Sequence, residues 1–328
     1  MNNIQLTFAC NGYDQIRDLA NGRVRAEGID LTYLDLPVEE IFFRFLKYRE
    51  WDISELSFGK YISLVSQGDP GFTALPVFVS RVFRLSSFYV RADGVKTAAE
   101  LRGKRIGLPE WAQTASLYSR GYLVHDAGVP LTEVEWVQAG LNQAGRVEKV
   151  ALKLPPGVRY ASRSDKSLSE LLLCGEIDCI LSARPPQPFV EGHPGMVRLY
   201  PDYRGAEEAH YRKTGIFPIM HVIVVRNEVL QLHPWTAMNL YQAFEEAKRR
   251  SLARMLDVTA SFAPFAWAYD EAARVQILMG GDAWPYGIEK NRATLEAILQ
   301  YGFEQGVCHR KLAPEDLFHP TVLASVKV

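Results

Sequence analysis

The sequence contains no run of apolar residues long enough to cross a membrane and no basic residue ahead of its first apolar stretch. That stretch is interrupted at Asn11 and Gly12, before it reaches the length of a signal peptide. The sequence therefore predicts a protein without a membrane span or an export signal, and we expect it in the cytoplasm.

An excess of charge of one sign is also missing. The chain has 37 Lys and Arg against 38 Asp and Glu, which gives a formal net charge of −1. Binding to a phosphate backbone depends on a concentration of basic side chains. Nucleic acid is therefore not an expected partner.

The motifs of several enzyme classes are absent as well. No G-x-G-x-x-G, P-loop or G-x-S-x-G segment occurs, so nucleotide binding and serine-hydrolase chemistry are not indicated. The histidines show no paired spacing, and no metal site is predicted. The four cysteines show no C-x-x-C spacing, which favours reduced packing residues over a redox or metal role; they are Cys10, Cys174, Cys179 and Cys308.

The pattern that is present indicates two α/β units. The 328 residues, 48% of them hydrophobic, are enough for two domains of ordinary size. Alternating segments at 4–10 and 29–36, followed by a helix after Pro37, follow the β-α-β order of a mostly parallel sheet. A second series of strands and helices begins near residue 95.

The predicted organisation is two lobes joined by a hinge. Lobe one comprises residues 1–92 and 216–328, a discontinuous α/β domain with C-terminal helices, and lobe two is the inserted α/β domain 93–215. In open α/β sheets, ligands bind at the carboxyl ends of strands, beside helix N-termini that favour anions. We therefore expect a small anionic molecule in a cleft between the lobes.

Polar side chains at predicted strand ends are the candidates for binding it. Ser57 follows Glu55 at the end of one strand, and Thr114 opens a helix after another, although either could simply cap a helix. Arg81, Arg84 and Arg184 also follow strands, and guanidinium groups match carboxylates, although surface arginines are common.

One histidine and three aromatic residues complete the candidate set. His221 lies inside an apolar strand at the predicted hinge, where it is either a proton carrier or a hydrogen-bonded core residue. Tyr13, Trp284 and Tyr286 could stack on a ring or serve as packing.

Five segments together resemble the 4,5-dihydroxyphthalate decarboxylases. They are residues 18–31, 37–44, 101–110, 214–221 and 284–287, so the resemblance extends over nearly the whole chain. It implies a type 2 periplasmic-binding-protein fold with an interlobe cleft. It also implies loss of one carboxylate from a dihydroxylated phthalate, which gives protocatechuate and CO2.

This chemistry requires an acid at the ring carbon, an acceptor at the phenol and cations for the carboxylates. Our hypothesis is that His221 protonates the ring and Glu110 accepts the phenol proton. The three arginines anchor carboxylates with help from Ser57 and Thr114. No organic cofactor is required, and the need for a divalent metal is left open.

The alternative hypothesis is a binding protein without catalysis. It would be a transporter component or a cytosolic sensor that uses the same cleft for a small anion. In either case the expected ligand is a small aromatic carboxylate. Assembly into a homo-oligomer is left open.

Overall fold

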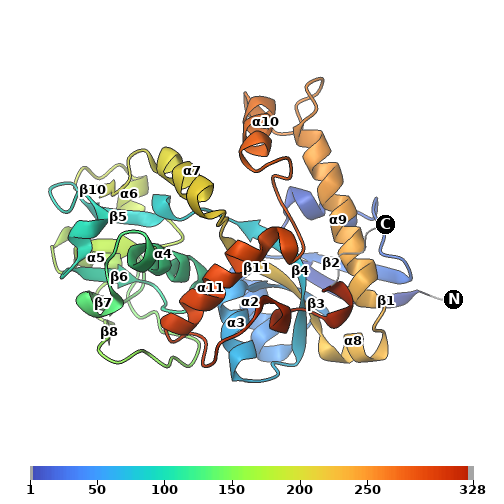
Figure 1. Cartoon of the computed structure of the whole chain (residues 1–328), viewed down its shortest axis with the longest axis horizontal. Helices are drawn as coiled ribbons and strands as arrows, with labels where there is room; N and C mark the ends of the chain where they lie inside the picture. Colours follow the sequence, from blue (N-terminus) through green and yellow to red (C-terminus); the bar gives the residue numbers. More distant parts are fainter. Residues whose placement is uncertain (1–2, 324–328) are drawn as a thin grey trace.

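The computed structural model describes residues 3–323 and contains two separate β-sheets, each with helices packed against it (Figure 1). The predicted α/β class with two sheets is confirmed. No helix in residues 3–323 combines the length and apolar character needed to span a membrane.

The first sheet has the strand order β2-β1-β3-β11-β4. Its strands are β1 (Ile4–Cys10), β2 (Ile29–Asp35), β3 (Ile53–Ser57), β4 (Phe72–Arg81) and β11 (Ile219–Arg226). Strand β1 is parallel to β2 and β3, whereas β11 runs antiparallel between β3 and β4. The associated helices are α1 (Arg17–Ala20), α2 (Val38–Tyr48), α3 (Phe58–Gln67), α8 (Asn227–Leu232), α9 (Thr236–Met255), α10 (Ala268–Leu278) and α11 (Arg292–Glu304).

The second sheet has the order β10-β5-β9-β6-β7-β8. Its strands are β5 (Phe88–Arg91), β6 (Arg105–Leu108), β7 (Glu135–Gln138), β8 (Arg159–Ser162), β9 (Cys179–Leu181) and β10 (Met196–Arg198). Its helices are α4 (Thr114–His125), α5 (Leu168–Leu173), α6 (Gln187–Val190) and α7 (Tyr203–Thr214).

The chain passes between the sheets twice. The sequence analysis placed residues up to 92 in lobe one, but β5 pairs with β9 and β10 of the second sheet. The first crossing between sheets therefore lies between β4 and β5, because a strand belongs to the sheet with which it forms hydrogen bonds. The chain returns after α7, where β11 enters the first sheet. The predicted boundary at 92 therefore falls after the first crossing, whereas the boundary at 216 stays a prediction.

The parts of the chain around the two sheets contact each other where α3 follows β3 and α4 follows β6. Gly59 in α3 makes this approach possible, because a Cβ atom there would lie 2.8 Å from the carbonyl oxygen of Ala112. Residues 53–57 of β3 are all buried. The N-terminal ends of α3 and α4 are consequently held against each other.

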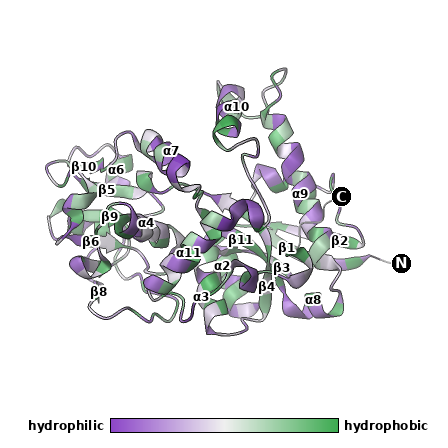
Figure 2. Cartoon of the chain, viewed as in Figure 1, coloured by the Kyte–Doolittle hydropathy of each residue, from purple (hydrophilic) through white to green (hydrophobic). Residues whose placement is uncertain are grey.

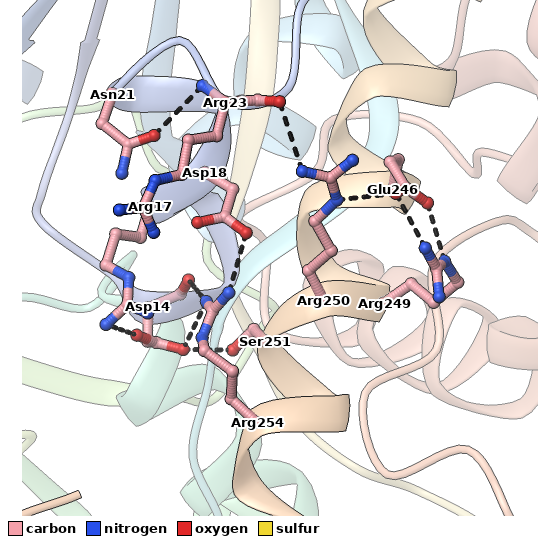
Figure 3. Close-up of polar contacts among 10 residues, drawn as sticks. All are labelled: Asp14, Arg17, Asp18, Asn21, Arg23, Glu246, Arg249, Arg250, Ser251 and Arg254. Carbon is pink, nitrogen blue, oxygen red and sulfur yellow. Dashed lines mark hydrogen bonds and ion pairs between the residues drawn. The ribbon is translucent and has the colours of Figure 1, made fainter. Parts of the chain in front are cut away.

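Helix α9 fixes the segment that follows β1 (Figure 3). Near the end of α9, the Arg254 guanidinium forms ion pairs with Asp18 at 2.7 Å and with Asp14 at 3.0 Å. Ser251 donates a hydrogen bond to the same Asp14 carboxylate, and Asp14 directly follows Tyr13. These contacts hold the backbone next to Tyr13 in one position.

Candidate functional site

His221 lies in β11 between two serines on the neighbouring strands. It stands opposite Ser57 of β3 and opposite Ser80 of β4. The pairing of β11 with β4 is irregular on both sides of His221. Bulges of this kind redirect a side chain and occur often beside active sites. The predicted strand position of His221 is confirmed.

The His221 imidazole is bound by a buried carboxylate. Its Nδ1 atom lies 2.6 Å from Oε1 of Glu55, which is fully buried in β3. The Tyr13 hydroxyl donates to the same oxygen at 2.7 Å and lies 3.4 Å from Nδ1. The backbone N–H of Asn11 donates to Oε2 of Glu55 at 3.0 Å. The result is a connected Tyr13–Glu55–His221 group.

The surroundings keep the Glu55 carboxyl ionised. Burial raises its pKa, but the hydrogen bond and charge of His221 and the donors Asn11 and Tyr13 outweigh burial, so the pKa is lower than usual. Burial and the charge of Glu55 raise the pKa of Tyr13 well above its ordinary value. Tyr13 therefore stays protonated and donates a hydrogen bond to the carboxylate.

Binding at Nδ1 leaves the second ring nitrogen of His221 available. Within residues 3–323, Nε2 forms no hydrogen bond, and the side chain is 19% exposed. The Phe42 ring stands edge-on at 5.0 Å between centroids and restricts rotation of the imidazole. A carboxylate at one nitrogen and a free second nitrogen suit an imidazole for proton transfer.

Ser57 and Thr114 meet across the junction between the sheets. Their hydroxyl oxygens are 3.1 Å apart, and the backbone N–H of Gly59 donates to Thr114 at 2.9 Å. The Ser57 hydroxyl does not cap α3, and the N-cap of α4 is Gln113. For both residues, the structure therefore favours a contact between the lobes over the simple capping role. Ser57 also lies opposite His221.

Glu110 lies at the same junction but is surrounded by cations. Its oxygens are 2.6 Å from Arg146, 3.3 Å from Lys149 and 3.4 Å from Lys60 of α3. Burial raises the pKa of Glu110, but these three cations outweigh it, and the net shift is downward. The structure forms no contact between Glu110 and His221 among the described residues. A carboxylate held by three cations is a weak proton acceptor, so the geometry does not favour the predicted role at the phenol.

Arg81 is directed into the protein and not toward a ligand. It donates to the carbonyl oxygens of Phe217 at 2.7 Å and Pro285 at 3.0 Å, and to Oδ1 of Asn291 at 2.7 Å. Burial lowers the pKa of Arg81 to about 10. These contacts connect segments of the protein to one another. The prediction that Arg81 binds a ligand carboxylate is therefore corrected.

The aromatic residues near the C-terminal loop also serve as packing. The Trp284 indole N–H donates to the carbonyl oxygen of Phe78 at 2.8 Å. Tyr286 is buried, with the ammonium of Lys248 4.4 Å from its ring centroid. Of the three aromatic candidates, Tyr13 alone contacts the Glu55–His221 pair.

The other two arginines occupy different environments. Arg84 donates to the Met220 sulfur at 2.8 Å and weakly to the Ala183 carbonyl at 3.4 Å, and no described carboxylate lies within ion-pair distance of it. Burial lowers the pKa of Arg84 to about 10. Arg184 is exposed and forms an ion pair with Glu39 of α2 at 2.5 Å, which links the two sheets' domains. Arg84 forms no ion pair among the described residues, although the charge of Glu207 acts on it. Met220, whose sulfur it contacts, precedes His221 in the chain.

Comparison with known proteins decides the family. The chain is 38% identical to a 4,5-dihydroxyphthalate decarboxylase of Comamonas testosteroni over the full length of both chains. It is 40% identical to one of Pseudomonas putida over 65% of this chain and 83% of that protein. The chain belongs to the 4,5-dihydroxyphthalate decarboxylase family. No family model matches it.

Solved structures support the fold of this family member. An aliphatic sulphonate binding protein of Escherichia coli superposes with a TM-score of 0.56 at 10% identity, over 98% of this chain and 99% of that one. A putative sulfonate-binding protein of Methylobacillus flagellatus gives 0.58 at 13% identity, over 98% and 93%. The predicted periplasmic-binding-protein fold is confirmed.

The sequence analysis of this decarboxylase family member missed the role of Glu55. It noted the residue beside Ser57 but gave the carboxylate role to Glu110. The available signal was a charged residue inside a five-residue strand whose other members are apolar or small, Ile53–Ser57. Within residues 3–323, no cluster of three or more His, Cys, Asp or Glu is arranged to hold a metal ion.

Proposed function

We propose that this protein is a decarboxylase that removes one carboxylate from 4,5-dihydroxyphthalate and yields protocatechuate and CO2. The observation that carries the proposal is the 2.6 Å contact between Glu55 and Nδ1 of His221, with Nε2 left free. The names of the two relatives support the substrate class, a small aromatic dicarboxylate.

The reaction needs a proton at the ring carbon that loses CO2. Each carboxylate of the substrate has a hydroxyl group para to it, which can push electrons toward that carbon while the carbon accepts the proton. The bond to the carboxylate then breaks, its electron pair restores the aromatic ring, and CO2 leaves. Overall, one proton is consumed for each CO2 formed.

His221 is the proposed proton donor. Nε2 gives its proton to the ring carbon, while Glu55 at Nδ1 holds the ring orientation and stabilises the imidazolium form before transfer. Tyr13 and the N–H of Asn11 hold the Glu55 carboxylate in turn. A positioned acid of this kind contributes about 10²- to 10⁴-fold to a rate.

The phenol and the carboxylates need separate partners. We assign the phenolic oxygen to the Ser57 and Thr114 hydroxyls, because Ser57 lies opposite His221 and its hydroxyl contacts that of Thr114. Arg84 is the proposed anchor for the carboxylate that remains, since it forms no direct ion pair with a described carboxylate. Arg184 would also bind the substrate, by giving up its ion pair with Glu39 and pairing with a substrate carboxylate instead.

Binding requires the lobes to separate and close again. The contacts between described residues that cross the junction include Ser57–Thr114, Lys60–Glu110 and Glu39–Arg184. The hollow of about 30 Å³ that touches Arg84 has room for little more than a water molecule. We therefore propose that substrate enters an opened form, and that closure excludes water from the reacting carbon.

The test is product analysis with a matched variant. The purified protein is incubated with 4,5-dihydroxyphthalate, and protocatechuate is measured by mass spectrometry together with released CO2. His221→Asn should bind the dicarboxylate but form no product. Binding by the unaltered protein without any product would favour the alternative, a small-anion binding protein.

Two further expectations stay predictions. The absence of a cofactor requirement is tested by assaying the protein after dialysis against a chelator, and the cytoplasmic location by cell fractionation.

A further inference from the structure

Lys60 is a buried cation that the proposed mechanism does not use. It is the only charged residue in residues 58–67 of α3, and this helix lies on the side of the first sheet nearer to the second sheet (Figure 2). Its Nζ atom lies 3.4 Å from Oε2 of Glu110, its one ion-pair partner among the described residues. Burial lowers the pKa of Lys60; Glu110 and the more distant Glu148 oppose this shift, and Lys149 adds to it. A buried ammonium group is costly unless negative charge lies close by, so a second anionic partner would be favourable.

The ion pair between Lys60 and Glu110 is unequal. Glu110 also binds Arg146 at 2.6 Å and Lys149 at 3.3 Å. These two cations belong to the same side of the junction as Glu110, since the Arg146 carbonyl accepts a hydrogen bond from Gln138 of β7. When the lobes separate as proposed above, Glu110 keeps two cations, whereas Lys60 loses its ion pair. The opened cleft therefore offers the Lys60 ammonium group to an incoming anion.

Lys60 borders the hydroxyl groups assigned above to the phenolic oxygen. It directly follows Gly59, whose backbone N–H donates to the Thr114 hydroxyl at 2.9 Å, and it lies three residues after Ser57, about one helical turn. Ser57 lies opposite His221, and directly opposed residues of antiparallel strands project to the same face. One small region of the junction thus contributes an ammonium group, two hydroxyls and an imidazole.

The proposed reaction creates negative charge on the phenolic oxygen. With the hydroxyl ionised, its oxygen pushes electrons into the ring and becomes a carbonyl while the para carbon takes the proton from Nε2 of His221. When the bond to the carboxylate then breaks, its electron pair restores the ring and the negative charge returns to the oxygen. A preorganised cation stabilises such a charge more strongly than neutral hydroxyl groups do.

We propose that Lys60 is a further catalytic residue, whose ammonium group binds the phenolic oxygen para to the departing carboxylate and keeps that oxygen ionised. This inference rests on the proposed decarboxylation. On binding, the hydroxyl proton passes to solvent and Lys60 exchanges Glu110 for the phenolate oxygen, while Glu110 stays paired with Arg146 and Lys149. His221 then supplies the one proton that is consumed for each CO2.

The ionisation of bound substrate tests this assignment without turnover. In the His221→Asn background, the ultraviolet absorbance of ionised 4,5-dihydroxyphthalate is followed as pH is raised. The bound phenol should titrate about 1–3 pH units below the free substrate, the range for one opposite charge within about 4–6 Å. Adding Lys60→Met should move the titration to that of the free substrate or above it, whereas Lys60→Arg, which keeps the charge, should preserve a lowered value. In otherwise unaltered protein, Lys60→Met should lower kcat about 10²- to 10³-fold.

Lys149→Met is the matched control, because Lys149 also binds Glu110 but comes from the other side of the junction and is 53% exposed. It should leave the titration of the bound phenol unchanged. The proposal is overturned if the phenol titrates alike with and without Lys60, or if Lys149→Met removes the shift equally. A lowered titration that depends on Lys60, without product from the unaltered protein, would keep the Lys60 contact and overturn the decarboxylation alone. Failure of the dicarboxylate to bind would overturn both.

Discussion

Replacing Glu55 by glutamine tests whether the carboxylate acts through His221. The substitution keeps the size of the side chain and an oxygen for the Asn11 N–H, but it removes the negative charge 2.6 Å from Nδ1 of His221. The protonated imidazole then loses a hydrogen bond to a charged partner, worth about 1.5–3 kcal/mol. Because 1.36 kcal/mol corresponds to a tenfold rate change, kcat should fall about 10- to 150-fold.

The assay is a double-mutant cycle on protocatechuate formation. Glu55→Gln, His221→Asn and the double variant are compared at saturating substrate, with folding checked by circular dichroism. If Glu55 acts through His221, Glu55→Gln should have little effect in the His221→Asn background, since residues acting as a unit are not additive. Asp178→Asn is the control, because Asp178 is a partly buried carboxylate of the second sheet that accepts a hydrogen bond from the Arg105 N–H.

Two results would refute this reasoning. Glu55→Gln could leave kcat unchanged, which would remove the carboxylate from the proton transfer. Alternatively, Glu55→Gln and His221→Asn could multiply their effects independently. A total loss of turnover in Glu110→Gln, with normal folding and binding, would instead restore the role predicted for Glu110 from the sequence.

The remaining predictions concern stability, binding and metal. The lowered pKa of Glu55 stabilises the fold above its unfolded pKa of about 4.5, and this contribution is lost as pH falls through the folded pKa. The difference in unfolding free energy between the unaltered protein and Glu55→Gln, measured in urea, should therefore shrink below that pH. Arg84→Met should raise KM about tenfold or more with a smaller effect on kcat, as steady-state kinetics would show. Arg81→Met should lower the unfolding free energy by about 2–4 kcal/mol, since two buried acceptors and one partly buried acceptor lose their donor; an unchanged melting temperature would contradict its structural role. Dialysis against a chelator should leave turnover unchanged, and restoration of a lost rate by added Mg²⁺ or Zn²⁺ would show a metal requirement.

The sequence predicted the α/β class and several contacts at the junction. Hydrophobic periodicity is local, so it located β1, β2 and β11 and placed His221 inside a strand. Ser57 and Thr114 were expected to bind the same ligand in the cleft because both follow strands, and the structure brings their hydroxyls to 3.1 Å. The short strand β5 was assigned to the other lobe, since four residues do not reveal the sheet with which they pair.

Residue type by itself determined what each side chain could do: an imidazole can carry a proton, and a guanidinium can bind a carboxylate. The tertiary structure decided which partner each group has. Glu55 and His221 are 166 residues apart and meet only because β11 inserts beside β3. Arg81 reaches acceptors more than 130 residues away and is thereby withdrawn from a ligand. A charged group acts through its nearest neighbours, and long-range packing selects those neighbours. The sequence therefore predicted the chemistry of the family, but only the fold showed that Glu55 is the carboxylate that binds His221.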